Sequence, residues 1–105
     1  MTNIKKYVDN IAEELHDSKC YMEKALEYKA MGATVPNAAD RYNGYKAMSV
    51  QELEHALRLH DYAVQDIEAL KAVYPDIPQS MQEAWDKSHV NFVEKTAWIK
   101  QMQAM

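Results

Sequence analysis

Hydrophobic and small residues recur at helical spacing along the first part of the chain, from about residue 3 to residue 31. They return every three or four positions, which is the repeat of an α-helix packed on one side. The residues are Ile4, Val8, Ile11, Leu15, Ser18, Met22 and Ala25. Gly32 and Pro36 follow directly, and both favour the end of a helix. Because the link is short, the next helix is predicted to run antiparallel to the first.

A second helical pattern covers about residues 38–73 and is the longest element expected. Asn37 or Asp40 would cap its start, and the proline at position 75 disfavours helix for the residue before it. Glu52 is predicted to lie at the centre of the apolar stripe of this helix. The stripe itself is predicted to run through Tyr45, Met48, Ala56, Leu59, Tyr62 and Ala63.

A third helix is predicted over about residues 79–103, where Ser80 and Glu83 have the spacing of a capping box. The chain holds only two glycines and three prolines, which favours long helices over a turn-rich β fold. The predicted fold is all-α: one domain, residues 1–105, forming an antiparallel bundle of three long helices. The third apolar stripe comprises Met81, Ala84, Trp85, Ser88, Phe92, Thr96, Ile99 and Met102.

Charge and cysteine content exclude several classes of function. The net charge is −4, which gives the chain no electrostatic reason to bind nucleic acid. Cys20 is the only cysteine, so no internal disulfide can form, and a reduced, cytoplasmic setting is the default expectation. No apolar run has the length that crossing a membrane requires, and we expect no membrane partner.

Glu52 stands where the apolar pattern would place a leucine. A carboxylate on the buried side of a helix is costly unless it is paired, hydrogen-bonded or bound to a metal. His55 follows three residues later on the same helix face, so the two side chains can reach one metal site. In the alternative, Glu52 is held by Lys19, Lys46 or a tyrosine hydroxyl, and His55 is an ordinary boundary residue.

The other two helices offer further candidate ligands. Glu14 is the best inward carboxylate of the first helix, with Tyr21 two turns further on. Asp86 and His89 repeat the three-residue spacing in the third helix, in a weaker form because Asp86 points away from the stripe. The alternatives are a flanking charge for Glu14 and surface or boundary positions for the other two. Carboxylate and imidazole ligands together suit zinc or manganese.

The segment around Glu52 and His55, from Met48 to Asp61, resembles the second helix of rubrerythrin-type ferritin-like proteins. In that family an acidic run with Glu-x-x-His precedes a helix of leucine and alanine. Small uncharacterised three-helix ferritin-like proteins, some of them from phages and prophages, are similar to the chain as a whole. The resemblance implies a ferritin-like bundle that holds iron, as a di-iron centre.

The resemblance extends to the other two helices. Glu14 followed by Tyr21 is similar to the family's first helix, where a ligand glutamate precedes a tyrosine. Asp86 and His89 would match a later Glu-x-x-His, with aspartate in place of glutamate. The implied metal ligands are therefore Glu14, Glu52, His55, His89 and Asp86.

The chain departs from the family in its number of helices. A ferritin-like bundle has four core helices, whereas three are predicted here, so we expect a homodimer to complete the bundle. The function expected is binding of iron or another divalent metal in the bundle core, with iron oxidation or storage as the chemistry that the resemblance implies. The alternative is a metal-free helical interaction or structural protein of phage origin.

Overall fold

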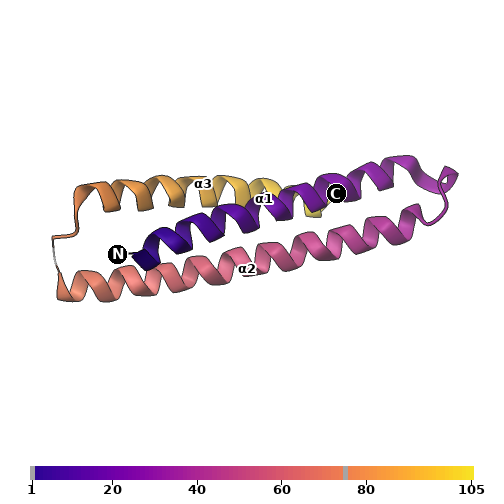
Figure 1. Ribbon diagram of the computed structural model, residues 1–105. Helices are drawn as coiled ribbons and strands as arrows, with labels where there is room; N and C mark the ends of the chain where they lie inside the picture. The colour runs from indigo at the N-terminus through magenta and orange to yellow at the C-terminus, as the bar shows by residue number, and fades with distance from the viewer. Residues whose placement is uncertain (1, 75) are drawn as a thin grey trace.

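Three long helices form the protein in the computed structural model, which describes residues 2–74 and 76–105. This confirms the prediction of an all-α chain with three helices, and no strand occurs in the part of the chain described. Figure 1 shows that α1 and α3 run in the same direction and that α2 runs opposite to both. The molecule is a rod of 60 × 18 × 16 Å. The elements are α1 (Thr2–Met31), the short 3-10 helix η1 (Gly32–Thr34), α2 (Ala38–Val73) and α3 (Gln79–Gln103).

The link between α1 and α2 contains two residues with left-handed backbone. Gly32 has a φ of 59° and ends α1, as its lack of a Cβ allows. Asn37 has a φ of 66° and precedes α2, but its side chain makes no capping hydrogen bond. Gly44 lies within α2, and although glycine is a poor helix former, the helix continues through it without a break.

The predicted capping box at the start of α3 is wrong. Pro78 occupies the cap position and α3 begins at Gln79, so Ser80 already lies inside the first turn. Glu83 instead accepts a hydrogen bond of 2.9 Å from Nε2 of Gln79. Pro78 has a φ of −52° and a ψ of 134°, so it precedes the first helical residue without being helical itself.

One hydrophobic core runs along the three helices, and the stripe predicted for α1 supplies its centre. Leu15, Met22 and Ala25 are fully buried, and Val8 is the one member of that stripe only partly covered. Leucine and methionine side chains buried to this extent contribute about 1.5–3 kcal/mol each. The cluster is Ile11, Leu15, Met22, Ala25, Leu53, Ala56, Phe92, Ile99 and Met102.

A pair of buried serines fixes the register of α1 against α2. Ser18 Oγ donates to the carbonyl of Ser49 at 2.7 Å, and Ser49 Oγ donates to the carbonyl of Ser18 at 2.8 Å. Gln103 of α3 adds a hydrogen bond of 3.0 Å from its Nε2 to Ser49 Oγ. Small side chains let the two helices approach closely, and the reciprocal bonds satisfy their buried hydroxyls. One turn from this pair, Glu14 and Glu52 are brought to the same level of the rod.

The predicted apolar stripe of α2 is partly wrong. Met48 and Tyr62 remain 40% and 45% exposed, whereas Leu53 is buried. The packed face is rotated toward Leu53 because the contact with α1 is made through Ser49 and its neighbours. Glu52 therefore lies on the flank of the core, half-buried, and not at its centre.

The third helix covers only one side of the α1–α2 pair. Its contacts are mostly with α1, and it adds Phe92, Ile99 and Met102 to the core. Met48 and Tyr62, on another side of α2, stay exposed. None of the helices described is both long and apolar enough to cross a membrane.

Candidate metal centre

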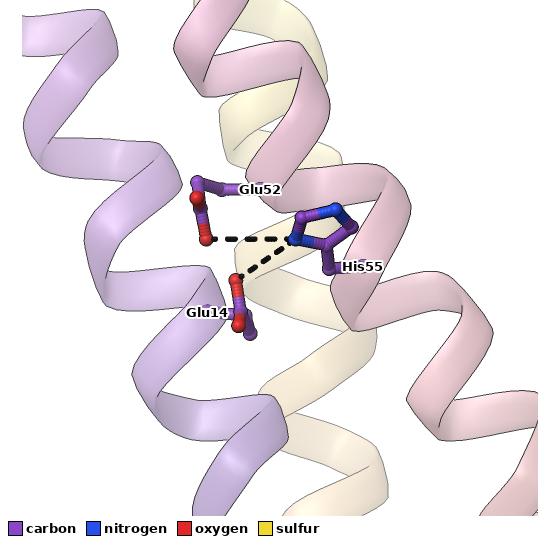
Figure 2. A group of neighbouring side chains, drawn as sticks. All are labelled: Glu14, Glu52 and His55. Atoms are coloured by element: carbon purple, nitrogen blue, oxygen red, sulfur yellow. Dashed lines mark ion pairs between the residues drawn. The ribbon is translucent and has the colours of Figure 1, made fainter.

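Glu14, Glu52 and His55 converge between α1 and α2. Figure 2 shows Glu14 reaching across from α1 to the other two side chains, which come from α2. Nδ1 of His55 lies 3.6 Å from Oε2 of Glu14 and 3.9 Å from Oε2 of Glu52. One ligand atom from each residue lies within 4.8 Å of the other two. The three side chains that the sequence placed first as metal ligands are thus brought together.

Local helix geometry explains this convergence. Glu52 and His55 are three residues apart, so they project from neighbouring turns of the same face of α2. Glu14 lies four residues before Ser18, and the reciprocal serine bonds fix which turn of α1 faces Glu52. The register of the helices, more than any loop, sets the site.

The carboxyl group of Glu14 is in an environment that opposes its ionisation. Interaction with the neighbouring carboxyl group of Glu52 is the largest cause, followed by burial and by the negative charge of Glu52. Together they raise the pKa of Glu14 to about 7, although the neighbouring His55 acts in the opposite direction. Glu14 is therefore only partly ionised at neutral pH, and a cation placed beside the two carboxyl groups would favour its ionised form.

Oε2 of Glu14 is buried and has no hydrogen-bond donor among the described residues. The lysines proposed from sequence as partners of Glu52 are engaged elsewhere. Lys19 forms a surface ion pair with Glu23, and Lys46 lies over the ring of Tyr42. In the part of the chain described, no lysine or arginine forms an ion pair with either carboxylate of the cluster.

The donor set and its spacing suit a transition-metal cation. Carboxylate oxygens and imidazole nitrogens bind iron, zinc and manganese at about 2.0–2.2 Å, so ligand atoms around one ion lie roughly 3–4.4 Å apart. The distances of 3.6 and 3.9 Å to His55 fall inside that span. The side chain of His55 is 58% exposed, whereas those of Glu14 and Glu52 are 27% and 24% exposed. The cluster therefore opens toward solvent at the imidazole.

The comparisons with known proteins identify no relative of the chain. No family model, curated protein or solved structure matches the chain. The ferritin-like relationship and the identity of the metal therefore stay predictions.

His89 and Asp86, the remaining candidate ligands, are not part of the cluster. Nδ1 of His89 lies 3.0 Å from Nε2 of His60 on α2. Asp86 is exposed and accepts a hydrogen bond of 2.9 Å from Nε2 of Gln82. The one group of three potential ligands found among the described residues contains neither of them.

His60 is a residue that the sequence gave no reason to select. Its ring lies parallel to that of Phe92, with centroids 4.0 Å apart, and it also packs on Trp85. Burial lowers the pKa of His60, and the neighbouring His89 lowers it further, against a smaller opposing effect of Asp61. Because its partner comes from another helix, no spacing along the chain reveals the pair.

Proposed function

We propose that the chain binds a divalent metal ion through Glu14, Glu52 and His55. The observation that carries this proposal is the convergence of two carboxylates and an imidazole, with no lysine or arginine of the described residues paired to them. A pair of carboxyl groups that raises the pKa of one member to about 7 is costly to the fold, and metal binding offsets that cost.

Two copies of the chain are proposed to complete the site. Three protein ligands do not fill the coordination sphere of an iron or manganese ion, and the imidazole of His55 is open to solvent. Met48 and Tyr62 are exposed on the same side of α2, seven residues before and after His55. A second copy related by a two-fold axis would cover these apolar side chains and supply a second set of ligands.

The doubled site would have four carboxylates and two imidazoles. That is the donor set of dimetal centres in four-helix carboxylate proteins, in which each ion is held from several helices. We accordingly propose a ferritin-like assembly built from two chains, with iron as the leading metal and zinc or manganese as alternatives. Bound iron would supply oxidation or storage chemistry, while the chain's own part is to hold the ions and shield them from water.

A metal-free interaction protein is the second candidate function. The observation in its favour is the pKa of about 7 for Glu14, which lets a proton on Glu14 take the place of a cation. In that case the exposed side with Met48 and Tyr62 would serve a protein partner and the cluster would be a structural carboxyl pair. The two functions differ in whether removing Glu52 changes metal binding.

Glu52→Gln is expected to weaken binding of Mn²⁺ and of anaerobic Fe²⁺ by at least tenfold, because it replaces a charged ligand by a neutral amide. Isothermal titration calorimetry measures this directly. Glu54→Gln is the matched control, since Glu54 lies two residues away on α2, is exposed, and is not part of the cluster. Equal affinity in wild type, Glu52→Gln and Glu54→Gln would reject the site and favour the metal-free function.

A further inference from the structure

We propose that His60 and His89 form a second metal site, made of imidazoles only, which takes Cu²⁺, Ni²⁺ or Zn²⁺ and fastens α3 to α2. The site is separate from the carboxylate cluster, and the proposal does not depend on the function proposed above. It follows from the position of two ring nitrogens from different helices.

Nε2 of His60 and Nδ1 of His89 face each other at 3.0 Å. At this distance one imidazole donates an N–H to the other, so a single proton lies between the two rings. A metal ion can take the place of that proton, because the donating ring can carry its proton on its other nitrogen instead, which leaves the facing nitrogen of the neutral imidazole as a ligand.

The spacing is close to what a cation requires. Two nitrogens bound at about 2.1 Å in neighbouring positions of a square or octahedral ion are about 3 Å apart, and in a tetrahedral ion about 3.4 Å apart. The rings of His60 and His89 meet nearly end to end, with centroids 5.2 Å apart and planes at 28°. A turn of one ring is needed to direct both lone pairs at one ion, and His89 is free to make it because it is exposed.

The other half of the site is rigid. His60 is half-buried and its ring lies parallel to that of Phe92, with only 4° between the planes. The ring of Trp85 packs on the same imidazole at 5.5 Å. One fixed ligand and one adjustable ligand make a site that can adapt to the cation without rearranging the helices.

The donor set determines which cations are expected. Neutral imidazoles favour Cu²⁺, Ni²⁺ and Zn²⁺, whereas Mg²⁺ and Ca²⁺ prefer oxygen ligands. The rest of the coordination sphere would be water, since His89 faces solvent. Because α3 makes most of its contacts with α1, an ion held by His60 and His89 would strengthen the smaller α2–α3 contact.

Trp85 provides a local reporter for the test, because its ring lies 5.5 Å from that of His60 and 6.2 Å from that of His89. The measurement is quenching of tryptophan fluorescence by Cu²⁺ in the full chain carrying Trp98→Phe and Cys20→Ser. The first change removes the other tryptophan, and the second removes the thiol next to His16 as a competing copper ligand. We expect saturable quenching by Cu²⁺ and none by Mg²⁺.

Adding His89→Gln to this background should raise the Cu²⁺ concentration that gives half-maximal quenching by at least tenfold. His60→Gln should have the same effect. His89 is exposed, so its substitution tests the site even if the half-buried His60 proves necessary for folding. His16→Gln in the same background should leave the quenching curve unchanged, because His16 is exposed and belongs to neither proposed site. An undiminished curve in His89→Gln, or a curve lost in His16→Gln, would overturn the proposal.

Discussion

Glu14→Gln is expected to abolish tight binding of Mn²⁺ or Fe²⁺ and, at the same time, to stabilise the metal-free protein at pH 8. The loss of binding follows because a carboxylate ligand becomes an amide. The gain in stability follows because the ionised form of Glu14 is disfavoured in the fold by Glu52 and by burial. A residue kept for packing alone would show neither effect.

The sign of the pH dependence follows from the direction of the shift. The pKa of Glu14 is about 7 in the fold against an ordinary value of 4.5, so the folded protein holds this proton more tightly than the unfolded chain. Its contribution to the free energy of unfolding is therefore full below pH 4.5 and is lost as the pH rises through 7. Because the side chain keeps some contact with water, we expect a change of about 1–2 kcal/mol.

Urea unfolding in the presence of EDTA, at pH 5 and at pH 8, measures this contribution. The wild-type protein should lose stability between the two values by more than Glu14→Gln does. Glu13→Gln is the matched control, because Glu13 is exposed and adjacent in sequence. An identical pH dependence in wild type and Glu14→Gln would contradict the electrostatic account of the cluster.

The proton on the carboxyl group of Glu14 also makes the metal affinity depend on pH. Below pH 7 a cation must displace the Glu14 proton, so the affinity for Mn²⁺ should fall by about tenfold for each further unit of acidification from this group alone. Calorimetry at pH 6 and pH 7.5 tests the trend, and an affinity independent of pH in this range would exclude Glu14 as a ligand.

Leu15→Ala is expected to remove about 2–5 kcal/mol from the free energy of unfolding. Leu15 is fully buried in the core, and its deletion leaves a cavity between helices that cannot collapse easily. Since the free energy of unfolding of a small domain is about 5–15 kcal/mol in total, this one substitution would remove a large fraction of it.

Chemical denaturation compares Leu15→Ala with Val90→Ala, whose side chain is 55% exposed on α3 and should matter little. Adding Mn²⁺ should recover part of the stability of Leu15→Ala, because an ion bound only by the folded protein stabilises it by mass action. Equal stability of the two variants would mean that the core is not the one described.

The helices were predictable from sequence because their apolar repeats and chain breaks agree. The predicted ranges 38–73 and 79–103 coincide with α2 and α3, and α1 begins one residue earlier than expected. The α1 stripe was right because aliphatic side chains mark a core unambiguously. The α2 stripe was partly wrong because Tyr62 and Met48 can lie at an edge as well as in a core, and pattern alone does not separate the two.

The candidate site was predictable only within each helix. Spacing placed Glu52 and His55 on one face of α2, but their distance from Glu14 depends on the helix register, which the buried pair Ser18 and Ser49 determines. Ser18 stands in the predicted stripe of the first helix, but Ser49 lies outside the stripe predicted for the second, so the pattern does not indicate this contact. The approach of two histidines from different helices was likewise outside what spacing can show.

We propose above all that two copies of the chain share metal through Glu14, Glu52 and His55. Native mass spectrometry of the protein loaded with Mn²⁺ or with anaerobic Fe²⁺ tests it most directly, because it counts chains and ions in the same particle. We predict dimers that carry two ions, with both the ions and the dimers lost in Glu52→Gln. Monomers that hold an ion at full affinity, or dimers of Glu52→Gln that retain two ions, would contradict the claim.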